Sequence, residues 1–388
     1  MSFFRDSTSL LIVALIAVIF AASKTASAAS APHSVAVFSY TAGLSSPDAS
    51  ITRAAVAVLS CKIDSTLELN TVLESEYSLV SGGISASKLW ERNSPEAARV
   101  ARSLRADMIV SVRLVSRAGG KIGAEARIAA VSKEKVAWRK IDLNIPSGDI
   151  AGFQKKIAVA LLESLSPGSG KEAAASMPYT SSRAAFNSFG DGIGQIEAGR
   201  GDDALKSFSA AERADKNFRD LFYYLGKYFA TQKFDYEKAL SYMGRIIAQN
   251  PNDAGAQYWL GFTYYLKGDS ARSIRAFETS VKLKPMQPDA YSYLAVLYKD
   301  RAQLEKVEAY YMKALEMAPR NAAAWYNLGA VQSVMGKTSE SLSSLSKALD
   351  LDCDSFLPIV KNDADFINAR KKPDFSKTIK DYARKCGK

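Results

Sequence analysis

The hydrophobic pattern of the second half of the chain repeats with a nearly fixed period. Units begin at positions 185, 219, 254, 288 and 322, so successive starts lie 34, 35, 34 and 34 residues apart. In each unit, apolar side chains recur at i, i+3 and i+4 spacing over two successive stretches, which predicts a pair of amphipathic helices. The eighth position always carries a small residue: Gly192, Gly226, Gly261, Ala295 or Gly329. Each unit is therefore predicted to be a closely packed helical hairpin.

The second helix of three units is followed by a proline, which lacks an amide hydrogen and cannot extend the helix before it. These prolines are Pro251, Pro285 and Pro319. Together with the pattern of residues 322–352, they resemble the tetratricopeptide repeat (TPR). The resemblance covers residues 184–355 and implies five units of an all-α superhelix, an α-solenoid whose concave face binds peptides or partner helices. The first unit departs from the pattern, because Asp191 replaces the usual leucine and Lys216 the usual proline.

The candidate binding residues lie on the first helices of the units, on the side that the resemblance places in the groove. Most are aromatic, and aromatic side chains supply large, rigid contact areas in binding surfaces. The alternative is that several of them pack between neighbouring repeats. The candidates are Phe189, Tyr223, Lys227, Tyr258, Phe262, Tyr265 and Tyr326.

Two segments flank the repeats. Residues 356–388 contain apolar positions that can cover the last hairpin, among them Phe356, Phe366 and Phe375, and they are predicted to form a helical cap. A solenoid needs such an end, apolar inside and polar outside. Residues 168–183 are rich in Ser, Gly and Ala and predict a linker.

The pattern differs between residues 29 and 167, where short strand-like runs alternate with helical stretches. Strands are predicted at 34–40, 77–83, 107–120, 121–133 and 135–145, and helices at 48–67, 94–106 and 149–165. This order predicts an α/β sandwich in which helices cover a mixed sheet. The whole chain is then a two-domain α+β protein, with the sandwich ahead of the repeats.

The opening run "VAVFSY", the phrase "AARVARSLRADMIVSVRLVSRAGG" and the closing helix together resemble the amino-terminal domain of TolB and its relatives. The resemblance implies a protein-interaction module. No β-propeller follows it, which distinguishes the chain from a complete TolB.

Residues 1–28 have the order of a secretory signal. Arg5 precedes the apolar stretch Leu10 to Ala22, and the small residues Ala26, Ser27 and Ala28 offer a cleavage site. The apolar stretch is shorter than the roughly 20 residues that span a bilayer. We expect export to the periplasm or cell envelope; the alternative is an uncleaved segment that anchors the protein to the inner membrane.

Composition argues against an enzyme. His33 is the single histidine, so the usual catalytic triads and histidine-rich metal sites have too few residues, and we expect no catalytic residues, no cofactor and no metal. The run Gly190, Gly192, Gly194 does not follow a strand, and Glu172 stands where a phosphate loop needs Ser or Thr. Neither motif predicts a nucleotide site.

The net charge of +11 is spread along the chain, so no segment predicts a nucleic-acid partner. The basic tail near residues 370–388 is interleaved with aspartates, which favours a solvated face. Weak contact of this tail with an anionic envelope surface is the alternative.

Three cysteines remain. Cys353 stands where earlier units carry their proline and Cys386 ends the predicted cap, so a disulfide between them would fix the cap to the last hairpin. The alternative is that all three are reduced, with Cys61 in any case a buried free thiol.

The sequence thus favours an exported, non-enzymatic scaffold that binds a protein or peptide partner of unknown identity in its TPR groove. The alternative is a regulatory subunit of an envelope synthase or secretion complex that acts through its amino-terminal domain.

Overall fold

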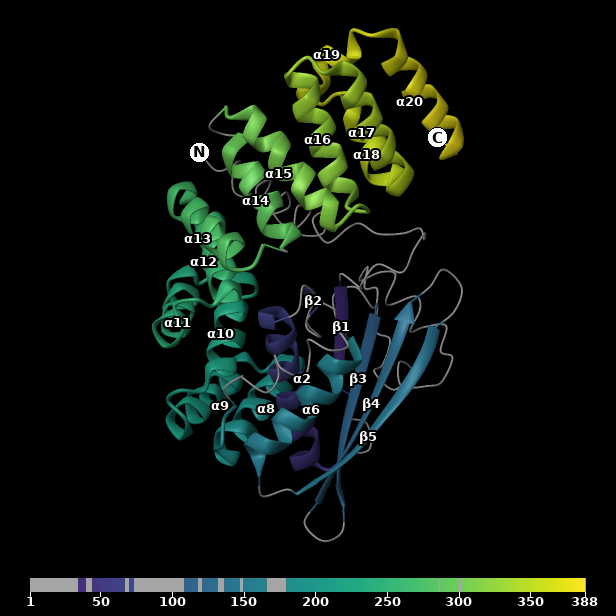
Figure 1. Ribbon diagram of the computed structural model, residues 1–388. Helices are drawn as coiled ribbons and strands as arrows, with labels where there is room; N and C mark the ends of the chain where they lie inside the picture. Colours follow the sequence, from purple (N-terminus) through teal and green to yellow (C-terminus); the bar gives the residue numbers. More distant parts are fainter. Residues whose placement is uncertain are drawn as a thin grey trace. The chain divides into compact units, whose positions relative to one another are not determined.

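The computed structural model describes residues 34–39, 44–66, 70–72, 108–117, 121–131, 136–146, 149–165, 179–285, 287–299 and 302–387 (Figure 1). The predicted signal segment, the strand at 77–83, the helix at 94–106 and most of the linker lie outside these residues. The chain divides into two compact units, one formed by Ala29–Lys267 and one that contains Gly268–Lys388. Each is described by itself below.

The first unit contains a five-stranded sheet in the order β2-β1-β3-β4-β5. β1 pairs in parallel with β2 and β3, whereas β3, β4 and β5 form an antiparallel meander, so the sheet is mixed. Alternate residues of β3, Val110, Val112 and Leu114, are buried, as expected for a strand with one face on the core. The strands are β1 Ser34–Ser39, β2 Asn70–Val72, β3 Met108–Arg117, β4 Lys121–Val131 and β5 Val136–Pro146.

Two helices accompany the sheet: α2, Ser46–Thr66, and α6, Ile150–Leu165. α2 contacts β1, β2, β3 and α6. Thr52 of α2 also accepts a hydrogen bond at its Oγ1 from the backbone N–H of Leu114, at 3.2 Å. Residues Ala54 to Leu59 are all buried, six in succession, so this part of α2 is covered on every side.

The remaining helices of the first unit form hairpins. The pairs α8–α9 and α10–α11 are complete, and α12 is the first helix of the third repeat; their bounds are α8 Arg183–Glu197, α9 Gly201–Ala214, α10 Arg219–Thr231, α11 Tyr236–Gln249 and α12 Ala254–Lys267. A Cβ atom on Gly192 would lie 2.4 Å from the Phe208 ring, and one on Gly226 would lie 2.2 Å from the Met243 side chain. The small residue at the eighth position is therefore required by close helix packing.

The second unit continues the same pattern. It comprises α13 Ser270–Leu283, α14 Pro288–Lys299, α15 Leu304–Met317, α16 Ala322–Val334 and α17 Thr338–Leu351. A cap follows, with α18 Cys353–Val360, the 3-10 helix η1 Ala364–Phe366, α19 Ile367–Arg370 and α20 Pro373–Lys385. The buried side chains of Phe356, Phe366 and Phe375 join the core of the last hairpin.

Candidate functional site

The concave side of the first repeats carries a helix of the same chain. α2 packs along α8 and also contacts α10 and α12, which are the first helices of three successive repeats (Figure 1). The residues of α2 and of these repeats share one hydrophobic core. α2 therefore occupies the face that a TPR partner is expected to use.

Glycines allow α2 to approach α8 at backbone distance. A Cβ atom on Gly190 would lie 1.8 Å from the carbonyl oxygen of Ser50, and one on Gly194 would lie 2.9 Å from the Arg53 guanidinium. Because these glycines are four residues apart, they share one face of α8. Two glycines of the run, Gly190 and Gly194, are thus explained by this contact, which the sequence analysis did not foresee.

Polar contacts border the same seam. The Ser50 hydroxyl donates a hydrogen bond to the Asp191 carboxylate, which explains why an aspartate replaces the usual leucine of the repeat. Arg53 Nε donates to Glu197 Oε2 at 2.8 Å. Burial raises the pKa of Glu197 and the Arg53 charge partly offsets this effect. Both pairs join α2 to α8 across more than 140 residues of sequence.

The chain entering the first repeat is attached to both α6 and the first hairpin. Gln154 of α6 donates from Nε2 to the Thr180 carbonyl at 2.8 Å, and the Thr180 hydroxyl donates to Asp215 Oδ2 at 2.6 Å. Ser182 then caps α8 by accepting from the Ala185 N–H at 3.1 Å. These bonds fix the start of the repeats against the α/β domain.

Four of the predicted groove residues lie buried in the core of this unit: Phe189, Tyr223, Lys227 and Phe262. The Phe189 ring lies 5.3 Å from that of Phe218 and 5.4 Å from that of Tyr224, and the Lys227 ammonium lies 4.8 Å from the centre of the Trp259 ring. The expectation that these four line an open surface is corrected. The contacts of Phe189 and Lys227 join neighbouring repeats, which favours the alternative that these residues pack between repeats. Their role in binding a partner stays a prediction.

Two predicted residues on α12 are less deeply buried. Tyr258 and Tyr265 are intermediate in exposure, and the Tyr258 ring is parallel to that of Phe262, with the ring centres 6.5 Å apart. Tyr258 and Phe262 thus lie side by side on α12, and Phe262 is the more deeply buried of the two.

Tyr326, the last predicted groove residue, is covered by the cap. Its ring lies 4.8 Å from that of Phe356 and 5.2 Å from that of Phe366, and its hydroxyl donates to Asp363 Oδ2 at 2.6 Å. Burial and this hydrogen bond raise the pKa of Tyr326 above its usual value. Like the four residues above, Tyr326 does not line an open surface, and the expectation that it does is corrected.

Further polar contacts seat the cap on α14 and α16. Lys299 forms an ion pair with Asp365, and Asn368 Nδ2 donates to the Ser333 carbonyl at 3.0 Å. The Ala369 N–H donates to the Ser333 hydroxyl at 3.2 Å. Sequence reasoning predicted the apolar cap residues but not these acidic contacts, because the aspartates appeared only as charges that interrupt a basic tail.

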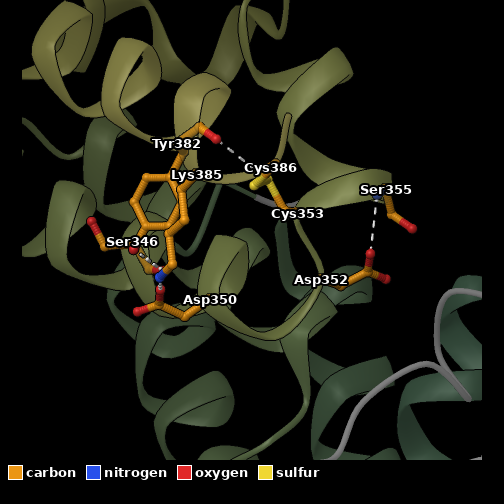
Figure 2. Close-up of a disulfide and its surroundings, with 8 residues drawn as sticks. All are labelled: Ser346, Asp350, Asp352, Cys353, Ser355, Tyr382, Lys385 and Cys386. Atoms are coloured by element: carbon orange, nitrogen blue, oxygen red, sulfur yellow. Dashed lines mark hydrogen bonds and ion pairs between the residues drawn. A yellow bond between two sulfur atoms is a disulfide. The ribbon is translucent and has the colours of Figure 1, made fainter. Parts of the chain in front are cut away.

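A disulfide joins Cys353 at the start of α18 to Cys386 after α20, the pairing that the sequence predicts, with Cα atoms 6.5 Å apart (Figure 2). Nearby, the Tyr382 hydroxyl donates to the Ser346 carbonyl at 3.0 Å, and Lys385 forms an ion pair with Asp350 at 2.5 Å (Figure 2). Burial and the neighbouring Asp350 raise the pKa of Tyr382 to about 12. The bond closes a ring that contains the whole cap. The side chain of Cys61 lies outside the described residues.

Within the ranges described, no cluster of histidine, cysteine, aspartate and glutamate is arranged to hold a metal ion. The same residues include no helix of the length and apolarity needed to cross a bilayer.

The repeated hairpins define the class of this region, which is a TPR solenoid. Three family profiles, each described as tetratricopeptide repeat, match residues 235–288, 288–321 and 310–343. Tetratricopeptide repeats are thereby supported over residues 235–343 of the predicted array, and these profiles do not extend to the amino-terminal domain, whose resemblance to TolB they do not support. TPR folds generally serve as non-catalytic interaction scaffolds.

Relatives with similar sequences differ widely in what they are. A TPR repeat-containing protein of Methanocaldococcus jannaschii is 34% identical over 113 residues, covering 29% of this chain and 20% of that protein. A protein O-mannosyl-transferase of Homo sapiens is 25% identical over 165 residues, and the match covers 41% of this chain and 18% of that protein. The photosystem I assembly protein Ycf3 of Rippkaea orientalis is 28% identical over 134 residues, and the match covers 30% of this chain and 76% of that protein. The chain therefore spans about a fifth of the first two relatives.

Two solved structures illustrate the likeness at the level of the fold. MamA is 22% identical, with 41% of this chain and 92% of that chain covered and a TM-score of 0.38. YrrB, described as a TPR protein with an unusual peptide-binding site, is 16% identical, with 48% and 92% covered and a TM-score of 0.39.

Proposed function

We propose that this protein is an exported, non-enzymatic scaffold of a bacterial cell envelope that holds a protein partner on its TPR array. The observation that carries the proposal is the array itself, because TPR arrays are interaction modules. The signal-like residues 1–28 support export. The Cys353–Cys386 disulfide supports it independently, since such bonds persist in oxidising compartments.

The packing of α2 on the repeats favours a second candidate, a regulatory subunit that acts through its α/β domain. In that case, the first repeats serve to hold α2 and the domain built around it. The resemblance of this domain to TolB stays a prediction, and it adds the expectation of a second contact surface. Weak attraction of the basic tail to an anionic envelope surface is a further, minor part of the proposal.

Site-specific photo-crosslinking in cells separates the two candidates. A crosslinking residue replaces Tyr265 or Met312 on the repeats, or the exposed Lys155 or Lys156 on α6. Capture of one protein from the repeat positions supports the scaffold, whereas capture from α6 alone supports the regulatory subunit. Fractionation of the same cells tests export, because a full-length protein retained in the cytoplasm contradicts it.

Deleting residues 184–388 would not give this answer. α2 shares a core with α8 and α10, so the deletion exposes apolar surface of the α/β domain. Loss of partner capture after that deletion would follow from misfolding under either candidate.

A further inference from the structure

The cap covers one stripe of α16. Tyr326, Ala330 and Ser333 are buried and lie at i, i+4 and i+7, on one face of the helix. In the repeat pattern, they correspond to Tyr258, Phe262 and Tyr265 of α12. The cap thus occupies the position on the last repeat that a groove ligand is expected to take.

The part of the cap that touches this stripe is a short turn, residues 363–369, which we call the cap turn. Its two aspartates meet the Tyr326 hydroxyl and the Lys299 ammonium. Between them in space, the Phe366 ring is fully buried against Tyr326, and the Ala369 N–H reaches the Ser333 hydroxyl. The turn is bound as a peptide would be, by two acidic groups, one aromatic anchor and one backbone contact.

The disulfide secures the cap turn from both sides. Cys353 precedes the turn and Cys386 follows it, so the turn lies inside a covalent ring with a sequence separation of 33 residues. A tethered segment already competes at an effective concentration near the millimolar range. Closing the ring removes most of the remaining freedom that would let the turn leave α16.

We propose that this face of α14 and α16 is a binding site for an acidic-aromatic peptide segment of a partner, with the cap turn as its resident ligand and the disulfide as its latch. A dithiol reductant opens the latch. It supplies two electrons and two protons, the Cys353–Cys386 bond breaks to give two thiols, and the reductant becomes a disulfide. The proposal rests on the proposed function, because it names the chemistry that the array recognises.

The test uses the full chain and a synthetic peptide of residues 361–370, KNDADFINAR, with blocked ends. Binding is measured by fluorescence anisotropy to the oxidised protein and to the Cys353→Ser/Cys386→Ser variant. We expect the variant to bind the peptide at least about tenfold more tightly, equivalent to about 1.4 kcal/mol. A peptide with both aspartates replaced by asparagine is the matched control, and it should lose most of this gain.

A second measurement guards against a variant that fails to fold. The unaltered protein is treated with dithiothreitol and then reoxidised, and peptide binding should appear and disappear with the two steps. Hydrogen exchange should show faster exchange in residues 361–370 of the protein when peptide is added, because the peptide replaces the cap turn.

Three outcomes overturn the proposal. Equal peptide binding by oxidised and reduced protein shows that the disulfide is no latch, and equal binding of the asparagine peptide shows that the acidic groups are not recognised. Dimers of the serine variant, detected by light scattering, would identify a second copy as the occupant. None of these results bears on capture of a partner in cells, so failure of this proposal is distinguishable from failure of the proposed function.

Discussion

Two segments of the chain cover first helices of TPR hairpins, and different interactions hold them in place. α2 lies on α8 with backbone contact at Gly190, and six successive residues of α2 are buried. The cap lies on α16 through Asp363, Asp365 and two buried phenylalanines, and it is closed by a disulfide. Removing α2 would expose apolar surface on a helix that also packs on the sheet, whereas removing the cap turn would expose the Phe366 ring and also break the polar contacts of Asp363 and Asp365.

This difference separates a permanent cover from a releasable one. α2 belongs to the core that the α/β domain and the first repeats share, so the concave face beneath it is structural. The cap turn covers its face through contacts that a second acidic segment could replace. The repeat pattern alone predicts an open groove at both places and does not distinguish the face under α2 from the face under the cap turn.

The largest expected effect comes from breaking the disulfide. For a separation of 33 residues, loop closure predicts a loss of about 3–4 kcal/mol from the stability of the cap. Hydrogen exchange of α20 amides should therefore accelerate by about two to three orders of magnitude in reductant, while α2 amides keep their rates. The Cys353→Ser/Cys386→Ser variant should be insensitive to reductant, and equal acceleration in α2 would show that the two covers are coupled.

The next effect distinguishes glycine at the seam from glycine in open space. Gly190→Ala places a methyl group against the Ser50 carbonyl, and we expect a net destabilisation of about 1–3 kcal/mol. Gly244 in α11 has no neighbour within 4 Å of an added Cβ, so Gly244→Ala should stabilise the protein by up to about 1 kcal/mol. Thermal unfolding of the two variants measures both. Stabilisation by Gly190→Ala would contradict the close approach of α2.

A smaller effect is expected from removing one hydrogen bond in the cap or one at α2. Tyr326→Phe removes the hydrogen bond that the Tyr326 hydroxyl donates to the Asp363 carboxylate, and we expect a loss of about 1–2 kcal/mol in cap stability. Ser50→Ala removes a hydrogen bond to Asp191, whose carboxylate is exposed and can bind water instead, so the expected loss is below about 1 kcal/mol. Urea unfolding followed by tyrosine fluorescence and circular dichroism ranks the two, and a larger loss for Ser50→Ala would reverse the assignment.

The smallest effect is a dependence of cap stability on alkaline pH. The folded-state pKa of Tyr382 is raised to about 12 from an ordinary value of 10.0, so its contribution to stability is complete below pH 10 and is lost as pH rises toward 12. The cause is burial together with the neighbouring Asp350. Exchange of α20 amides, after correction for the intrinsic pH dependence, should increase over this window and less so in Tyr382→Phe. An identical increase in that variant would assign the effect to another group.

The sequence predicted the parts of the fold that depend on local pattern. The hairpins follow from small residues such as Gly192 and from apolar spacing within one unit, and both helices of each hairpin are neighbours in sequence. Cys353 and Cys386 could be paired because the cap had to fold back on the last hairpin. The contact of α2 with α8 could not be predicted, since it joins residues that are about 140 positions apart.

The candidate site shows the same limit. Periodicity placed Tyr223, Phe262 and Tyr326 on the first helices of their units, but it carries no information about which other residues bury their side chains. The departures in the first repeat, Gly190 and Asp191, were visible in the sequence. Their explanation required the partner residue Ser50, which only the tertiary structure supplies.

The covalent ring around the cap also affects how the protein responds to proteases. A single peptide-bond cut between Cys353 and Cys386 adds one water molecule and leaves both fragments joined through sulfur, so the nicked chain stays one covalent molecule until it is reduced. The two ends created by such a cut remain beside α16, and Phe366 can stay packed on Tyr326. The ring would therefore preserve a cleaved carboxy-terminal end as a working cover.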